Sequence, residues 1–472
     1  MVKTIGNVQQ DAQVRAVASG TLSNGDTIIV NSDGTVSAVA GTSVSESVGS
    51  ATTIGSANMH NIAYDSTNNK VIITYLNRTT SIPYAIIGTV SGSSISFGTP
   101  AQIDGNQSDY TSVAYDPVAD KFAVFYGDYG DFEKGYAKVG TISGTSISFG
   151  TAVQFYSNSA VKYLSSVYDP DTGKIVTAFG GQYDYGYAVV GTISGTSISF
   201  GTVVAYRSSR ADWNAITYDT ANNKVVIAYA DNVTRAAAIV GTVSGTSISF
   251  GSQANINSAN SNRFYIAYDT ANAKVVVTYT STSTYGYAAV GTVSGTSISF
   301  GSEVQFSPAV SYYGAVSYHA ASGKVVIPFR NDTTNGALKA ATVSGTSLTF
   351  DTLFEFDAGE VYYVLSVYDS NAQKTVIAYS DASLVGSSVV YEPSYSSTNL
   401  TSENFIGFAD GSYADTQSAV INTTSSVDRN QTSLTAGQKY YVQTDGSLSE
   451  TADDPSVEAG TAISATEILV KG

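Results

Sequence analysis

The sequence contains no cysteine, only two histidines and two methionines, and a single tryptophan among its 472 residues. The absence of cysteine excludes disulfide frameworks, thiolate zinc sites and cysteine nucleophiles, and leaves the redox compartment open. Helix-forming Leu, Glu and Lys are scarce, whereas 34 tyrosines, 43 glycines and abundant Ser and Thr are typical of strands and turns. We therefore expect an all-β protein, and we expect no cofactor.

Basic residues are few as well. The 22 Lys and Arg residues stand against 38 Asp and Glu, which gives a formal net charge of −16 without any Lys/Arg run. Such a chain repels a phosphate backbone, so nucleic acid is not an expected partner. No stretch approaches the roughly 18 apolar residues of a membrane span, and residues 1–10 lack the apolar core of a secretory signal. We expect a protein made in a cytoplasm, without membrane insertion.

A repeat of about 50 residues occupies most of the chain, and such a period decides the fold. GTVSGTSISFG stands intact at Gly241 and Gly291. A second element keeps the same phase: a Tyr followed by a turn and an apolar run, as in YDTANNKVVIAY from Tyr218. The near-copies of the first element start at Gly88, Gly140, Gly191 and Ala341. The seven repeat tyrosines are Tyr64, Tyr115, Tyr168, Tyr218, Tyr268, Tyr318 and Tyr368.

Each copy reads as four strands, a to d, separated by turns of small polar residues. In the fifth copy we place them at 264–269, 274–279, 287–293 and 297–306. Strand b is almost continuously apolar and β-branched, so both of its faces must be covered. Four-stranded sheets that cover one another around an axis form a propeller. The sequence thus predicts a seven-bladed β-propeller over residues 43–393.

The ends of the repeat array favour a closed ring. The seventh copy lacks an SGTSISFG segment, and residues 43–55 (SVSESVGSATTIG) resemble a strand d without partners. We expect this segment to complete the seventh blade. Outside the array, LSNGDTIIVNSDGTVS from Leu22 aligns with LTAGQKYYVQTDGSLS from Leu434, and both reach a hairpin-forming Asp-Gly pair. Residues 1–40 and 394–472 are therefore expected to form one small β-barrel or sandwich that carries the propeller as an insertion.

These features together resemble virion proteins of tailed phages of marine bacteria, cyanophages in particular. The resemblance rests on the tandem YDxxxxKVVIAY and VGTVSGTSISFG units, the opening SGTLSNGDTIIVNSDGTVSAV and the closing SVEAGTAISATEILVKG. It covers nearly the whole chain. It implies a structural protein displayed on the virion surface, as capsid decoration, fibre or tail appendage, with other virion proteins as partners, a homo-oligomeric state on the particle and assembly in the host cytoplasm. It supplies no ligand residues.

Few residues suit catalysis, and we do not expect an enzyme. His60 and His319 lie in or beside strands a, and His319 replaces the Asp that follows the repeat Tyr elsewhere, which indicates a turn or channel position. No GxSxG, Walker or His-X-X-X-His segment occurs. Carboxylates in the b–c loops of the second and third copies leave glycoside hydrolysis and Ca²⁺ binding open as alternatives. They are Asp128, Asp131, Glu133 and Asp184.

The loops divide into two groups, which predict two different faces. The a–b and c–d turns repeat with little change, whereas the b–c and d–a loops vary in length, charge and aromatic content. Recognition is usually built from variable loops on a repeated scaffold. Five residues before each repeat Tyr, where strand a enters from the variable face, stand Met59, Tyr110, Tyr163, Trp213, Arg263, Tyr313 and Tyr363.

Three functions remain open for this face. The six residues from Tyr110 to Tyr363 are the candidate binding residues, and such a ring stacks sugar rings or holds a protein loop. The competing interpretation is that these side chains wedge between neighbouring blades. The first function is a virion surface protein that attaches to a host-surface receptor or glycan. The second is the tip of a receptor-binding tail fibre, and the third is a polysaccharide depolymerase.

Overall fold

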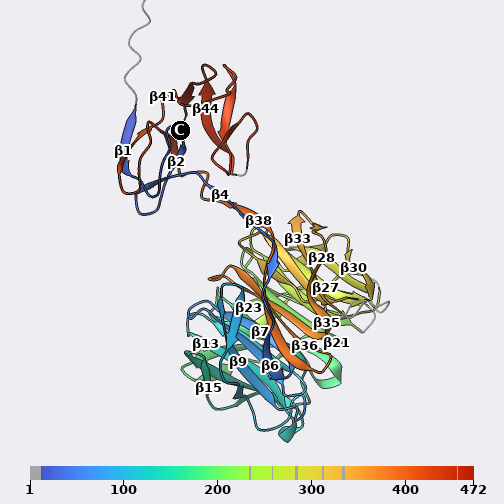
Figure 1. The fold of residues 1–472 in the computed structure, drawn as a ribbon. Coiled ribbons are helices and arrows are strands. Elements are labelled where there is room, and N and C mark those ends of the chain that lie inside the picture. The colour runs from blue at the N-terminus through green and yellow to red at the C-terminus, as the bar shows by residue number, and fades with distance from the viewer. Residues whose placement is uncertain are drawn as a thin grey trace, which may run out of the picture. The chain divides into compact units, whose positions relative to one another are not determined.

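The computed structural model describes residues 12–232, 235–257, 259–281, 285–310, 313–331, 335–453 and 455–471. Over these ranges the chain is all-β, as predicted: it has no α-helix, and its two short 3₁₀ turns are η1 (Tyr129–Asp131) and η2 (Gln182–Asp184). No helix in the described part is long and apolar enough to cross a membrane. The chain divides into two compact units, residues 46–393 and residues 1–45 with 394–472 (Figure 1).

The larger unit consists of seven strand repeats, and all of its strand pairs are antiparallel. Repeat 1 contains β7 (Asn58–Asp65), β8 (Lys70–Leu76), β9 (Pro83–Ser91), β10 (Ser94–Phe97) and β11 (Ala101–Gln102). Repeat 2 contains β12 (Thr111–Asp116), β13 (Lys121–Asp128), β14 (Lys134–Ser143), β15 (Ser146–Phe149) and β16 (Val153–Tyr156). Repeat 3 contains β17 (Lys162–Asp169), β18 (Lys174–Gly180), β19 (Tyr185–Ser194) and β20 (Ser197–Phe200). The long β21 (Val204–Asp219) ends repeat 3 and begins repeat 4.

Repeat 4 continues with β22 (Lys224–Asp231), β23 (Arg235–Ser244), β24 (Ser247–Phe250) and β25 (Ala254–Asn255). Repeat 5 contains β26 (Ser261–Asp269), β27 (Lys274–Ser281), β28 (Tyr285–Ser294), β29 (Ser297–Phe300) and β30 (Val304–Val310). Repeat 6 contains β31 (Ser317–His319), β32 (Lys324–Arg330), β33 (Asn335–Ser344) and β34 (Ser347–Phe350). The long β35 (Phe354–Asp369) leads from repeat 6 into repeat 7, which continues with β36 (Lys374–Asp381) and β37 (Val385–Glu392).

The prediction of one continuous strand d over 297–306 is wrong. The structure has two strands there, β29 and β30, and both pair with β28 on either side of a break at Gly301. A Cβ on Gly301 would lie 2.4 Å from the carbonyl oxygen of Thr346, in the c–d turn of repeat 6. The strand breaks because its backbone turns to lie directly against the turn of the next repeat, which only glycine permits.

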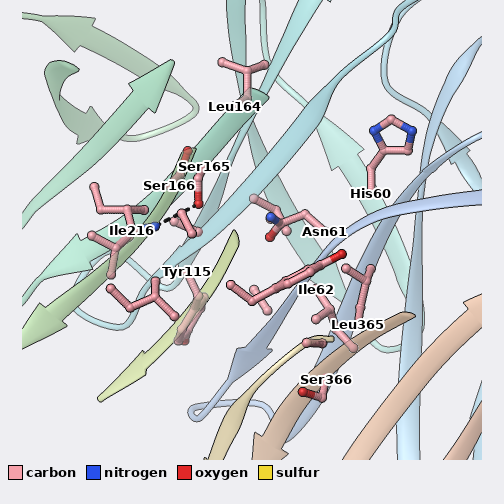
Figure 2. A pocket seen from close by; sticks show the side chains of 18 of the residues that line it. His60, Asn61, Ile62, Tyr115, Leu164, Ser165, Ser166, Ile216, Leu365 and Ser366 are labelled. Carbon is pink, nitrogen blue, oxygen red and sulfur yellow. Dashed lines mark hydrogen bonds between the residues drawn. The ribbon is translucent and has the colours of Figure 1, made fainter. Parts of the chain in front are cut away.

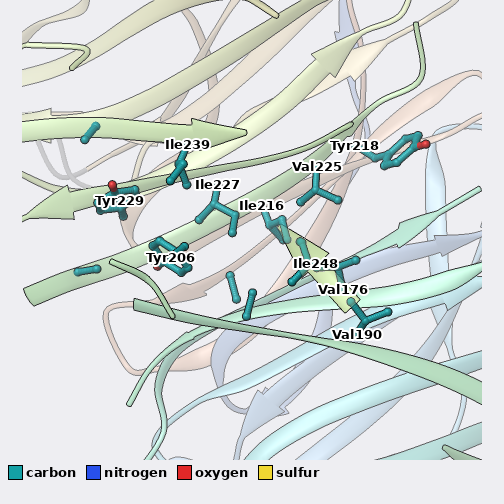
Figure 3. Close-up of a cluster of buried hydrophobic side chains, with 14 residues drawn as sticks. Val176, Val190, Tyr206, Ile216, Tyr218, Val225, Ile227, Tyr229, Ile239 and Ile248 are labelled. Atoms are coloured by element: carbon teal, nitrogen blue, oxygen red, sulfur yellow. The ribbon is translucent and has the colours of Figure 1, made fainter. Parts of the chain in front are cut away.

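Hydrophobic cores lie between neighbouring repeats. Figure 3 shows the core between repeats 3 and 4, where Val176 and Val190 meet Ile216 and Ile227. Equivalent clusters join every other neighbouring pair. Repeats 7 and 1 share one as well, which contains Val376 of β36 and Val71 of β8. Each strand b is therefore covered on both faces, as its apolar sequence predicts. The contacts between successive repeats return from repeat 7 to repeat 1.

The repeat tyrosine links neighbouring repeats by a hydrogen bond. The Tyr268 hydroxyl accepts the backbone N–H of Ala221 in the preceding a–b turn at 3.2 Å, and Tyr368 accepts that of Ala321 at the same distance. Tyr64 of repeat 1 accepts the N–H of Asn371 in repeat 7, also at 3.2 Å. The same contact thus joins the first and last repeats.

Residues before the first repeat pair with the seventh. β5 (Ser47–Val48) and β6 (Thr52–Ser56) are both antiparallel to β37. A Cβ on Gly49, between them, would lie 1.6 Å from the carbonyl oxygen of Ser93 in the c–d turn of repeat 1. This is the same close approach as at Gly301. The preceding β4 (Gly41–Val44) pairs instead with β38 (Tyr395–Thr398).

Hydrogen–deuterium exchange is expected to show slow exchange in peptides that cover residues 47–57. The Gly49 N–H donates to the Val390 carbonyl at 2.9 Å, and the Ala57 N–H donates to that of Leu384 at 3.1 Å, so opening these amides requires strand separation. β10, an outer strand of repeat 1, is the internal benchmark and should exchange at a similar rate. Exchange of residues 47–57 at the rate of an unfolded chain would contradict the pairing.

Besides the β4–β38 pair, the described part of the smaller unit contains two five-stranded antiparallel sheets built from its N-terminal and C-terminal segments. One sheet contains β1 (Gln13–Val17), β40 (Ser418–Asn422), β39 (Phe405–Ala409), β2 (Thr27–Val30) and β3 (Val36–Ala38). The other contains β41 (Val427–Asp428), β45 (Ile468–Val470), β44 (Val457–Ala462), β42 (Lys439–Val442) and β43 (Leu448–Ser449). A core that includes Ile29 and Val442 joins them. The two related hairpins, β2–β3 and β42–β43, thus lie in different sheets and share a core without pairing.

Candidate binding site

All six candidate binding residues line one cavity of about 460 Å³, hereafter the aromatic cavity. Every repeat contributes to its wall. The six side chains, Tyr110, Tyr163, Trp213, Arg263, Tyr313 and Tyr363, are all half-buried. The side chain of Met59, the seventh member of the series, lies outside the described residues.

The six side chains form an unbroken sequence of contacts from repeat 2 to repeat 7. Ring centroids are 5.1 Å apart for Tyr110 and Tyr163, 4.8 Å for Tyr163 and Trp213, and 5.3 Å for Tyr313 and Tyr363. The Arg263 guanidinium bridges the remaining interval, 5.7 Å from the Trp213 ring and 5.0 Å from the Tyr313 ring. Arginine stacks on aromatic faces, so it continues the ring where the other repeats have an aromatic side chain.

A backbone distortion directs these side chains to the cavity. Five of the six have a left-handed backbone, with φ between 51° and 59°. They are Tyr163, Trp213, Arg263, Tyr313 and Tyr363. In repeats 3, 4, 5 and 7 the pairing of strand a with strand b also shifts register there. A left-handed non-glycine residue costs about 1–2 kcal/mol, and bulges of this kind often turn a side chain toward a functional site.

The side chains both pack and face the cavity. Tyr110, Trp213, Tyr313 and Tyr363 contact cores between repeats. All four nevertheless keep solvent-accessible surface in the cavity wall. The two interpretations made from the sequence, packing and a binding ring, thus describe different parts of the same side chains.

A second cavity of about 460 Å³ adjoins the first; it is lined by first strands from six repeats and, in repeat 6, by Ala315 and Val316 just before β31. Figure 2 shows its wall, where small polar residues such as Asn61, Ser165 and Ser366 alternate with Ile62 and Ile216. The two cavities share lining residues on five first strands. These are His60, Leu164, Asn214, Phe264, Tyr265 and Leu365. Only the aromatic cavity has the stacked ring.

The aromatic cavity is close to neutral. Burial raises the pKa of Tyr110, Tyr163 and Tyr313, so their hydroxyls stay protonated and able to donate hydrogen bonds. Burial lowers the pKa of His60 to about 4, so this imidazole is neutral at pH 7. Among the described lining residues, Arg263 carries a positive charge and Asp109 a negative one. Flat apolar faces edged by hydrogen-bonding groups suit an uncharged, hydroxyl-rich ligand.

Three of the four loop carboxylates are engaged in local contacts. Asp128 accepts from the Gly130 N–H at 2.8 Å and caps η1. Asp131 pairs with Lys134 at 2.9 Å, and this hydrogen bond lowers its pKa, which is the opposite of what a general acid requires. Asp184 pairs with Lys162 at 2.9 Å. In the part of the chain that the structure describes, no three His, Asp or Glu side chains gather as a metal site.

His319 is the last residue of β31, directly before the a–b turn, at the place where the other six repeats have an Asp. Asp269 accepts the N–H groups of the residues two and three positions later. His319 instead accepts the Ser322 N–H through Nδ1 at 3.2 Å, and its Nε2 lies 2.9 Å from the Gln373 carbonyl oxygen. Its side chain is fully buried, and burial lowers its pKa to about 4.

Acid is expected to destabilise the larger unit partly through His319. Because the folded pKa is below the unfolded value of about 6.5, the unfolded chain binds the proton first, and stability falls as the pH drops from 6.5 toward 4. His319→Asp restores the residue of the other repeats. Between pH 7 and pH 5, wild type should lose about 2 kcal/mol more than this variant. Urea titrations at both pH values measure the difference, and equal losses would contradict it.

The structure adds lining residues that the sequence analysis missed. Asn214 and Tyr265 lie one and two positions after ring members, and Asp109 precedes Tyr110. The Tyr206 hydroxyl donates to Asn214 at 2.5 Å, and the Tyr129 hydroxyl donates to Asp109 at 2.8 Å. The repeat register could have identified these residues from the sequence, because residues next to the six ring residues line the same cavity.

Comparison with known proteins identifies no family for the chain. No protein-family description matches it. No curated protein is significantly similar to it in sequence.

Proposed function

We propose that this protein binds a glycan of the host-cell surface in the aromatic cavity, as a structural protein displayed on a phage virion. The observation that carries the binding proposal is the convergence of six stacked side chains from six successive repeats on one cavity. Stacked rings offer flat apolar faces to the C–H faces of sugars, while protonated tyrosine hydroxyls hydrogen bond to sugar hydroxyls.

The scaffold that we propose is a seven-bladed β-propeller, with repeats 1 to 7 as its blades. Three observations support it: the cyclic order of the inter-repeat cores, the hydrogen bond between Tyr64 and Asn371, and a wall made by all seven repeats around each cavity. The pairing of β5 and β6 with β37 supplies the outer strand of the seventh blade. In this scheme the two cavities are successive sections of the central channel.

The virion role rests on the resemblance of the repeat and terminal motifs to marine phage proteins. The acidic composition supports it, because a particle surface must not adhere to nucleic acid released in the host cell. We propose that the protein decorates the capsid, a fibre or a tail appendage in several copies, held there by other virion proteins. Several copies raise the strength of attachment through weak individual sites.

Two experiments test this function. Fluorescently labelled protein is applied to an array of bacterial surface polysaccharides, and we expect saturable binding to a subset of them. Electron microscopy of virions labelled with an antibody to the protein should then place it on the particle surface. Absence of binding to every polysaccharide would contradict the glycan proposal, and unlabelled virions would contradict the virion proposal.

A further inference from the structure

Two loops of the larger unit expose aromatic side chains. Phe132 is 84% exposed in the b–c loop of repeat 2, and Tyr183 is 74% exposed in that of repeat 3. Phe132 follows η1, and Tyr183 is part of η2. Large aromatic residues with so much surface in water contribute nothing to a core, so their presence requires another reason.

The backbone makes these side chains costly as well. Phe132 and Glu133 have φ values of 55° and 58°, and Tyr183 and Asp184 have 60° and 57°. Two successive residues with positive φ characterise a type I′ turn, for which Asn and Gly are strongly preferred. Both loops thus place an aromatic–acidic pair where folding favours Asn-Gly. Strain of this kind at an exposed side chain is characteristic of functional positions.

Hydrogen bonds connect both loops to the aromatic cavity. The Glu133 carbonyl accepts the Val161 N–H at 2.9 Å. The next residue, Lys162, pairs with Asp184 at 2.9 Å. Tyr163, which follows Lys162, lines the cavity. Phe132 and Tyr183 are therefore attached to the same short segment that leads to the cavity wall, one through Val161 and the other through Lys162.

We propose that Phe132 and Tyr183 form a second sugar-binding subsite, which extends the aromatic cavity into a site for a polysaccharide chain. This inference rests on the proposed glycan binding. A chain whose end occupies the cavity passes over residues 161–162 and reaches the two exposed rings. The Tyr185 ring, 5.7 Å from that of Tyr183, widens the apolar surface. Asp131 in the loop of Phe132 and Asp184 in the loop of Tyr183 supply carboxylates that accept hydrogen bonds from sugar hydroxyls.

The test measures how tightly wild type and the double variant Phe132→Asn, Tyr183→Asn bind short and long fragments of one polysaccharide. The array experiment supplies the polysaccharide that wild type binds, and its hydrolysate is separated into oligosaccharides of two to twelve sugars. Calorimetry should show that wild-type affinity rises with length. The double variant should bind the shortest fragment as wild type does but lose at least tenfold in affinity for the longest. Its melting temperature should equal or exceed that of wild type, because Asn tolerates positive φ.

Val118→Asn provides the matched control. Val118 is also 84% exposed but belongs to the a–b turn of repeat 2, so this variant should bind every fragment as wild type does. Wild-type affinity that does not depend on length, or a double variant that keeps full affinity for long fragments, would overturn the second subsite and leave the cavity proposal intact. Absence of binding to any fragment would overturn both proposals.

Discussion

Replacing Trp213 and Tyr313 together by alanine is expected to weaken glycan binding about 100-fold. Each ring is a large, rigid, half-buried face on one side of Arg263, and loss of an anchor of this kind costs about 1.5 kcal/mol or more. The loss of both rings therefore costs about 3 kcal/mol in total, which corresponds to a factor of about 100 in Kd.

Binding isotherms on the polysaccharide identified by the array measure this effect. The melting temperature should fall by only a few degrees, because both side chains are half-buried and also pack against cores between repeats. Phe200→Ala with Phe300→Ala is the control, since these half-buried rings belong to β20 and β29 and do not line the cavity. Normal binding by the Trp213 and Tyr313 variant, together with a large loss of stability, would assign the ring to packing alone.

Gly201→Ala is expected to destabilise the larger unit by about 3 kcal/mol, although it adds a single methyl group. The new Cβ would lie 1.8 Å from the carbonyl oxygen of Thr246, in the c–d turn of the next repeat. The Gly201 N–H donates to the Val190 carbonyl at 2.9 Å, and Thr246 lies in the tight turn between the paired residues Ser244 and Ser247. Neither backbone segment therefore moves without opening the contact between repeats. For a unit of this size, such a loss lowers the melting temperature by about 4 °C. Scanning calorimetry of the full chain measures it.

Asp351→Ala is the matched control for Gly201→Ala. Asp351 occupies the equivalent position in repeat 6, the one repeat of the seven without glycine there. Repeat 7 has no c–d turn, since its outer strands β5 and β6 come from the start of the unit, so nothing requires a glycine. Asp351 instead pairs with Lys324 at 2.9 Å, a partly exposed pair worth less than about 1 kcal/mol. Equal destabilisation by the two variants would contradict the proposed contact between repeats.

The repeat period was enough to predict the strands that form the cores. Strand b begins where the pattern predicts, at Lys274 in repeat 5, because a β-branched apolar run has no other stable environment. The break in strand d was not predictable from local sequence, because Gly301 is constrained by Thr346, a residue of another repeat. Asp351 could have indicated this contact from the sequence, because glycine is missing at this position only in the repeat whose following repeat lacks a c–d turn.

The candidate site was predictable to a similar extent. The position five residues before each repeat tyrosine identified six residues that the structure brings together in one cavity. Repeats of similar sequence fold alike, so equivalent positions line the same level of the cavity. The left-handed backbone at these positions has no sequence signature, since Tyr, Trp and Arg disfavour it. Phe132 and Tyr183 were missed because exposure in a variable loop depends on the path of the chain, which the repeat does not specify.

The most direct test of glycan binding in the aromatic cavity is a crystal structure of the protein with an oligosaccharide cut from the polysaccharide that it binds. We expect sugar density in the aromatic cavity, with one pyranose ring stacked against Trp213 or Tyr313 and a hydroxyl within hydrogen-bond distance of Arg263. An oligosaccharide bound only elsewhere, with the cavity occupied by water alone, would contradict glycan binding in this cavity.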